Sequence, residues 1–152
     1  MCQDKTMSKN KIGHLSLIIA AAIAIFTALA HISCIFLGER CYRAQLAPEL
    51  IIQSAANGNL LAPVATTFVS SLFLLCAVYA LSAAKIIMKL PLLKTAIYTI
   101  SIVCILRGLA TILLWLAYPE MFSSFPIIAG VTWFISGMLF LIGFRFRQAV
   151  VT

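Results

Sequence analysis

The sequence predicts an all-α fold: a four-helix transmembrane bundle with a short amphipathic helix between the first and second spans. Of the 152 residues, 63% are hydrophobic and only 10% are charged, which is more apolar surface than a soluble domain of this length can bury. Four apolar runs are each long enough, at about 1.5 Å per residue, to cross a hydrocarbon core of about 30 Å. We therefore expect one transmembrane domain over residues 1–152.

The first span is expected at about residues 15–37, after a basic segment that indicates a cytoplasmic tail. The basic start, the apolar core and Ala28-Leu29-Ala30 are also typical of a cleavable signal peptide, which is the alternative interpretation. The apolar run continues beyond that site to Leu37, and this continuation favours an uncleaved span.

The connector from Gly38 to Asn59 contains a segment, 48–56, that is predicted to be a short amphipathic helix. Pro48 suits its first turn, and Asn57-Gly58 is typical of a helix end. We expect this helix to lie at the membrane interface and to cover the outer mouth of the bundle, with an ordinary surface connector as the alternative.

The other three spans are expected at about residues 60–84, 92–116 and 125–144. Leu90-Pro91-Leu92-Leu93-Lys94 forms a tight link between the second and third spans, because Pro91 fixes the turn. Tyr118-Pro119-Glu120 ends the third span.

Basic residues mark one side of the membrane. They gather at the same set of span ends, namely Lys5, Lys9, Lys11, Lys85, Lys89, Lys94, Arg145 and Arg147. Only Arg40 and Arg43 fall on the opposite side, so the positive-inside rule predicts a multi-pass inner-membrane protein with both termini cytoplasmic. The net charge is +7, but most basic residues lie at the ends of apolar runs rather than along one exposed face with aromatic residues between them, so the sequence does not indicate nucleic-acid binding.

Small residues define the expected contact faces of the spans, since close backbone approach drives helix association in lipid. These faces comprise Ala20, Ala24, Thr27, Ala28 and His31 on the first span, Thr66, Ser70, Ala77 and Ala84 on the second, and Gly130 and Gly137 on the fourth.

Arg107 is the strongest candidate for a functional residue, because it lies well inside the third span, where a charge costs about 2.5 to 3.5 kcal/mol. Ser101, Cys104, Gly108 and Thr111 share its face within an arc of roughly 120°. We therefore expect Arg107 to face the interior of the bundle and to have a partner.

We expect a polar pocket in the outer half of the bundle, formed by His31, Glu39, Arg107, Thr66 and Ser70, with Glu39 as the preferred counter-ion of Arg107. Tyr42 and Arg43, which follow Glu39 closely in the sequence, complete the set of candidate ligand-binding residues. The alternative is that Arg107 and Glu39 form an internal pair that only fixes helix register, and that His31 makes an ordinary hydrogen-bonded helix contact.

The five cysteines form no Cys-x-x-Cys pair, and the three within apolar runs, Cys34, Cys76 and Cys104, are expected to be packing residues. No His, Cys or carboxylate cluster has metal-ligand spacing, and we expect neither a metal nor another cofactor.

Several short pieces resemble a group of small four-span bacterial inner-membrane proteins that carry no assigned activity. These pieces are His31, Gly38, Tyr42-Arg43, the run Tyr-Ala-Leu-Ser-Ala-Ala that ends at Ala84, the run Leu-Pro-Leu-Leu that ends at Leu93, and Leu106-Arg107-Gly108. The resemblance covers the first three spans and implies an architecture and a location.

Three functions remain open, and the first requires the fewest specific residues. It is a non-enzymatic inner-membrane protein that binds a membrane lipid, a small ligand or a partner membrane subunit through the outer pocket, alone or as a homo-oligomer. The second is a membrane enzyme for a lipid or quinone-like substrate, with His31 or Glu39 as general acid or base and Arg107 holding an anionic group. The third is an oligomeric small-molecule transporter, which lacks support from an internal repeat.

Overall fold

The chain is helical throughout most of the part that the computed structural model describes, which is the backbone of residues 2–121 and 124–148 with the side chains of 7–120 and 124–148. The elements are α1 (Cys2–Leu37), α2 (Glu39–Ala44), α3 (Glu49–Ala56), α4 (Leu61–Ala83), α5 (Leu93–Ala117), the 3-10 turn η1 (Pro119–Met121) and α6 (Ser124–Gln148). No strand occurs in the described ranges. The all-α class predicted from the sequence is confirmed.

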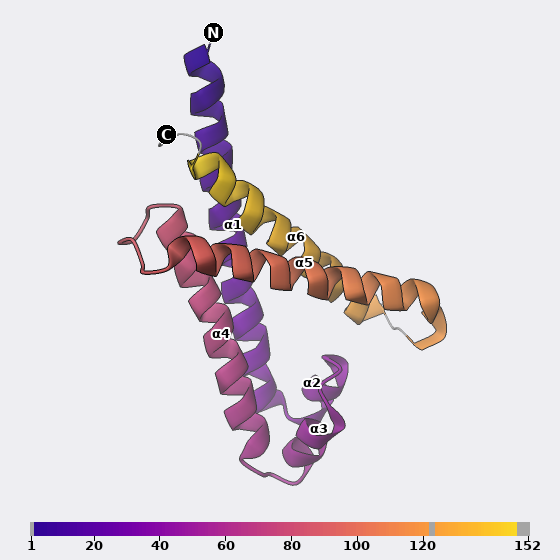
Figure 1. Cartoon of the computed structure of the whole chain (residues 1–152). Helices are drawn as coiled ribbons and strands as arrows, with labels where there is room; N and C mark the ends of the chain where they lie inside the picture. The colour runs from indigo at the N-terminus through magenta and orange to yellow at the C-terminus, as the bar shows by residue number, and fades with distance from the viewer. Residues whose placement is uncertain (1, 122–123, 149–152) are drawn as a thin grey trace.

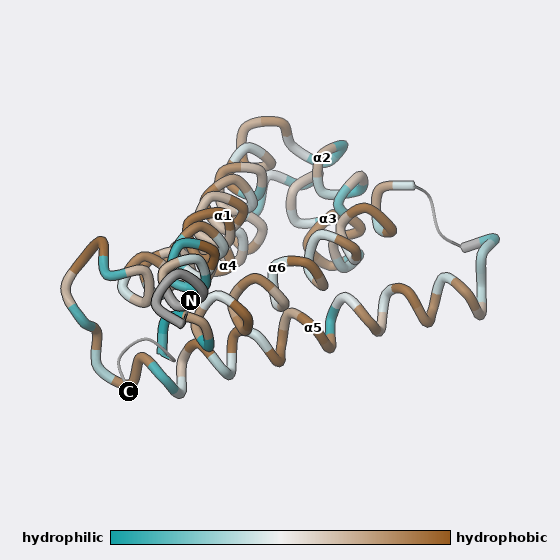
Figure 2. The backbone as a smooth tube through the Cα atoms, turned by 90° about the horizontal axis from the view of Figure 1, so that it is seen from above, coloured by the Kyte–Doolittle hydropathy of each residue, from teal (hydrophilic) through white to brown (hydrophobic). Residues whose placement is uncertain are grey.

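Four helices are long and apolar enough to cross a membrane: Met7–Leu37 within α1, and the whole of α4, α5 and α6. Large apolar side chains remain exposed along all four, as expected for helices whose solvent is lipid, and Figure 2 shows apolar residues along the length of each tube. The protein is therefore a multi-pass integral membrane protein.

The four long helices form two antiparallel hairpins. α1 packs along α4, α5 packs along α6, and α1 also contacts α6. Figure 1 shows that the α5–α6 hairpin runs across the α1–α4 hairpin rather than alongside it, and Figure 2 shows the same crossing from above. Both termini and the α4–α5 loop lie toward the end that the two hairpins share (Figure 1).

The α1–α4 interface is built on the small residues that the sequence predicted. Ala20, Ala28 and Ala24 of α1 are 0%, 0% and 7% exposed. Each predicted small residue of α4 is buried as well, namely Thr66, Ser70 and Ala77 within the helix and Ala84 at its C-cap. Short side chains on both helices let the two backbones approach closely, which is the main source of helix association in lipid.

The α5–α6 interface depends on glycines. A Cβ atom added to Gly108 of α5 would lie 2.6 Å from the backbone nitrogen of Phe134, and one added to Gly137 of α6 would lie 2.8 Å from the carbonyl oxygen of Ser101. These distances are shorter than any Cβ contact allows, so only glycine permits this helix spacing.

The two hairpins meet at a contact that we call the hairpin joint, formed by Asn10, Gly13, His14, Ala84, Gly143 and Arg147. The Arg147 guanidinium donates hydrogen bonds to the side-chain oxygen of Asn10 and to the carbonyl oxygen of Ala84, at 2.9 Å for the latter. His14 Nδ1 lies 3.1 Å from the same carbonyl oxygen. Gly13 and Gly143 lie where α1 and α6 approach closely, since a Cβ on Gly13 would be 2.8 Å from the Gly143 oxygen.

Three details differ from the sequence expectation. The basic N-terminal segment is not a separate tail, because α1 is one continuous helix of 36 residues that protrudes beyond the joint (Figure 1). The connector contains α2 in addition to the expected amphipathic helix, α3. α6 extends past residue 144 to Gln148, where Arg147 joins the hairpins.

Candidate functional site

The connector is tied to the end of α1 by a disulfide between Cys34 and Cys41, whose Cα atoms are 5.1 Å apart. Gly38 separates the two helices with a φ of 71°, a conformation that favours glycine, and this turn brings the cysteines together. The expectation that Cys34 is only a packing residue is therefore wrong. The signal in the sequence is the pair of cysteines on either side of Gly38 at a helix end, which is not a Cys-x-x-Cys spacing.

Tyr42 of α2 anchors the connector to α4. Its side chain is buried, and its hydroxyl lies 2.9 Å from the hydroxyl of Thr66. Thr66 donates its own hydroxyl proton to the carbonyl oxygen of Ala62 at 2.7 Å, so Tyr42 is the donor in the pair. Gln45 adds a hydrogen bond from its amide nitrogen to the Ala30 carbonyl oxygen at 3.1 Å.

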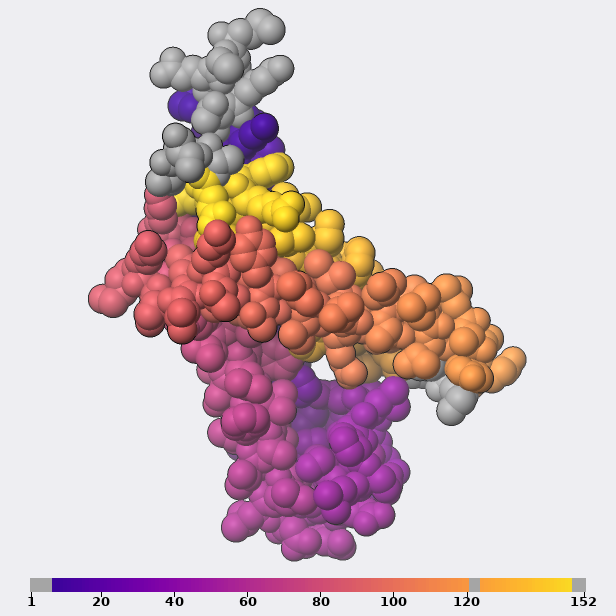
Figure 3. All heavy atoms as spheres, in the orientation of Figure 1, coloured from indigo at the N-terminus to yellow at the C-terminus, as the bar shows by residue number. Residues whose placement is uncertain are grey.

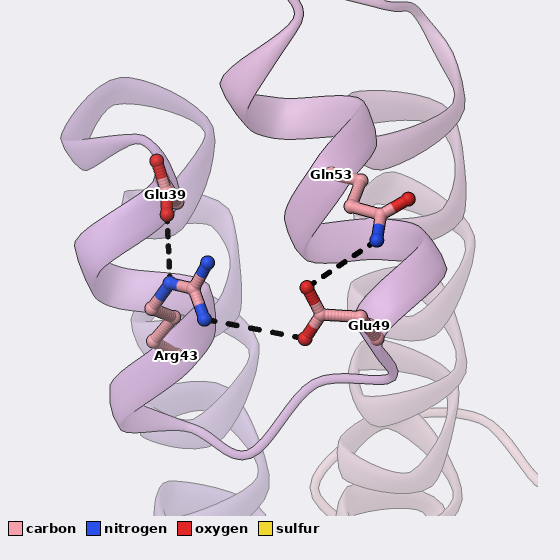
Figure 4. Close-up of polar contacts among 4 residues, drawn as sticks. All are labelled: Glu39, Arg43, Glu49 and Gln53. Carbon is pink, nitrogen blue, oxygen red and sulfur yellow. Dashed lines mark hydrogen bonds and ion pairs between the residues drawn. The ribbon is translucent and has the colours of Figure 1, made fainter.

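A chain of charged and polar side chains runs along the outer surface of the connector. Arg43 Nε donates to a carboxylate oxygen of Glu39 at 2.7 Å, and its NH1 lies 4.0 Å from Glu49, which accepts from Gln53 at 3.5 Å (Figure 4). The hydrogen bond to Glu39 raises the pKa of the Arg43 guanidinium, with a smaller contribution from the charge of Glu49. These four side chains lie at the surface, so water screens the charges of Glu39, Arg43 and Glu49.

His31 lies on an aromatic path that links the two hairpins. Its ring stacks on Phe73 of α4 with centroids 5.3 Å apart, and Phe73 contacts Trp133 of α6 at 5.2 Å with the rings tilted. All three side chains are half-buried. The sequence predicted His31 on the inner face of α1 but gave no reason to select Phe73 or Trp133, since aromatic residues also occur on lipid-facing surfaces.

Ser70 is 1% exposed, and its hydroxyl has no hydrogen-bond partner among the residues that the structure describes. It is one turn from Thr66 on the same face of α4.

Arg107 does not face the interior as expected. The side of α5 that packs against α6 carries Ser101, Cys104 and Gly108, all buried, whereas Arg107 is exposed. At about 100° per residue Arg107 stands at one edge of the predicted arc, so a small rotation of the helix turns it outward. Within residues 7–120 and 124–148 the Arg107 guanidinium forms no ion pair or hydrogen bond, and the preferred counter-ion, Glu39, pairs with Arg43 instead.

The predicted site is thus divided between the two hairpins. The α1–α4 side brings together Tyr42 with Thr66 and Glu39 with Arg43, and it also carries His31 and Ser70. Arg107 belongs to the other hairpin. Figure 3 shows that the α2–α3 segment and the α5–α6 hairpin are separated by an opening on this face of the molecule.

Two surface hollows lie away from these residues. One of about 560 Å³ is lined by residues 89–95 of the α4–α5 loop, and another of about 420 Å³ lies along the exposed side of α4 beside Pro63, Thr67 and Ser71. Where side chains are described, no three His, Cys, Asp or Glu residues come close enough to hold a metal ion.

Comparisons of this chain with family models, with curated proteins and with solved structures give no match.

Proposed function

We propose that the chain is a non-enzymatic inner-membrane protein that binds an anionic lipid or another membrane molecule through its outer half, with Arg107 as the contact for the negative group. The observation that carries this proposal is the exposed guanidinium of Arg107 within an apolar span. A charge at this depth requires compensation.

No side chain that the structure describes compensates the charge of Arg107. The sequence contains four acidic residues, of which Asp4 lies near the start of α1, at the end of that helix farthest from the connector. Glu39 and Glu49 accept the guanidinium of Arg43, and Glu120 lies beyond the end of α5 in η1. A phosphate or carboxylate from outside the chain is therefore the counter-ion that Arg107 requires, and a planar guanidinium binds either group in bidentate fashion.

We place this outer half on the side of the membrane that faces away from the cytoplasm, and we place both termini in the cytoplasm. Two independent features support this orientation. The basic span ends gather around the hairpin joint. The Cys34–Cys41 disulfide lies at the opposite end of α1, and disulfides persist in oxidising compartments such as the bacterial periplasm.

The proposal is tested with Arg107→Leu and Arg107→Lys, purified in mild detergent and compared with the wild type by mass spectrometry of bound lipids and proteins. We expect the wild type to retain an anionic molecule that Arg107→Leu loses and that Arg107→Lys keeps in part. Leu113→Ala, at an exposed position of the same helix, is the control and retains the wild-type set. Failed insertion does not explain a loss, because removal of the charge lowers the cost of inserting α5.

An unchanged set of bound molecules in Arg107→Leu would contradict the proposal. A retained protein subunit or a second copy of the chain, rather than a lipid, would identify the partner as a protein. Chemical conversion of the bound molecule by the purified protein would instead favour the membrane enzyme, with His31 or Glu39 as general acid or base.

A further inference from the structure

The α4–α5 loop presents lysines and large apolar side chains together at the basic end of the molecule. Lys85, Lys89 and Lys94 are all exposed. Between them Met88 and Leu92 are 82% and 77% exposed. Apolar side chains interspersed with lysines at a membrane boundary are typical of segments that lie in the headgroup region.

This loop has a defined conformation. Ser82 of α4 is buried, donates to the carbonyl oxygen of Met88 at 2.9 Å and accepts from the backbone N–H of Leu90 at 3.0 Å. The Tyr79 hydroxyl donates to the carbonyl oxygen of Pro91 at 3.4 Å. The exposed side chains therefore extend from a loop that is fixed to the end of α4.

The loop also forms the hollow of about 560 Å³ that residues 89–95 line, with Lys89 and Lys94 among its lining residues. No acidic residue occurs between residues 85 and 95. Within the described side chains, none of the three lysines forms an ion pair. The hollow is thus cationic, open to the surface and bordered by apolar side chains.

We propose that the α4–α5 loop binds the headgroup of an anionic phospholipid from the cytoplasmic leaflet. Lys89 and Lys94 contact the lipid phosphate, while Met88 and Leu92 contact the upper part of the acyl chains. This site lies at the end of the spans opposite to the outer half that contains Arg107. Its assignment to the cytoplasmic leaflet rests on the proposed orientation, whereas the lipid contact does not involve Arg107. Its failure would leave the Arg107 proposal untouched.

The test measures lipid retention by native mass spectrometry of the full chain, titrated with phosphatidylglycerol or with phosphatidylcholine of the same acyl chains. The double variant Lys89→Gln/Lys94→Gln is compared with Lys9→Gln/Lys11→Gln, which removes the same charge from the exposed N-terminal part of α1. We expect the ratio of phosphatidylglycerol binding to phosphatidylcholine binding to fall about 25-fold in the loop variant, at about fivefold per lysine. The same ratio is expected to stay unchanged in the control.

Equal losses in the two double variants would overturn the proposal, because they would reduce it to an effect of net charge.

Glycerol 1-phosphate, added as a competitor of the bound lipid, distinguishes a lipid site from a site for a free phosphate ester. Competition at the same concentration as phosphatidylglycerol would overturn the lipid assignment, whereas weak competition supports it. Met88→Ser/Leu92→Ser is expected to weaken both lipids without abolishing the preference between them, and unchanged binding of both would contradict the apolar contact.

Discussion

The hydrogen bond between Tyr42 and Thr66 predicts unequal effects of its two simplest substitutions. In Tyr42→Phe, Thr66 keeps its bond to the Ala62 carbonyl oxygen, so only one net hydrogen bond is lost, at a cost of about 1 kcal/mol. In Thr66→Val the buried Tyr42 hydroxyl loses its acceptor, and the cost rises to about 2 to 3 kcal/mol.

Thermal unfolding in detergent measures this difference, and Thr67→Val on the exposed side of α4 is the matched control. A larger loss for Tyr42→Phe than for Thr66→Val would show that the assigned direction of the bond is wrong.

Arg43 and Arg107 illustrate how differently two arginines of one chain are used. Arg43 is exposed beside two carboxylates, and the hydrogen bond to Glu39 raises the pKa of its guanidinium, which therefore stays charged well above neutral pH. The ion pair also requires ionised carboxylates, so acid as well as strong base breaks it. Arg107 has no such partner within the described chain, and this difference makes it the candidate contact for an external anion.

At the scale of elements, the close α5–α6 contact at Gly108 predicts that a Gly→Ala substitution changes stability in the direction opposite to that expected from helix propensity. Gly→Ala within a helix ordinarily stabilises by about 1 kcal/mol. Gly108→Ala is instead expected to destabilise by about 1 to 3 kcal/mol, because the new Cβ would meet the backbone nitrogen of Phe134 at 2.6 Å, and no side-chain rotation can relieve that contact.

Denaturation in mixed micelles measures the effect. Thr99→Ala on the exposed side of α5 is the control and is expected to change stability little. An increase in stability for Gly108→Ala would show that α5 and α6 are farther apart than they are in this structure.

At the scale of the whole molecule, the positions of the connector and of the α4–α5 loop predict which segment faces which compartment. Leu46 of the connector and Met88 of the loop are both exposed, so each accepts a substitution to cysteine. In a background with all native cysteines replaced by serine, we expect a membrane-impermeant maleimide to label Leu46→Cys in intact cells and Met88→Cys only after permeabilisation.

The reverse labelling pattern would contradict the orientation. A separate control on the native chain checks the disulfide, because Cys34 and Cys41 should react with a maleimide in denaturant only after reduction, whereas Cys76 and Cys104 should react without it.

The sequence alone determined the four apolar spans of this protein. Span lengths followed from the thickness of the hydrocarbon core, and the observed bounds of α4 and α5 differ from the expected ones by a single residue at each end. The contact residues Ala20, Ala28 and Gly137 were also predicted, since small side chains are where helices approach in lipid. These properties depend on local composition, which a single chain records directly.

Only the tertiary structure decided how the elements meet. Arg147 reaches the Ala84 carbonyl oxygen 63 positions away, and Cys34 pairs with Cys41 because Gly38 adopts a left-handed turn. Arg107 lies at the edge of a polar arc, so its exposure depends on how far α5 rotates against α6. The physical reason is that a membrane helix is apolar on nearly all sides. Hydrophobic periodicity therefore does not select its neighbours, and close backbone contacts at a few glycines and alanines fix the angle at which the hairpins cross.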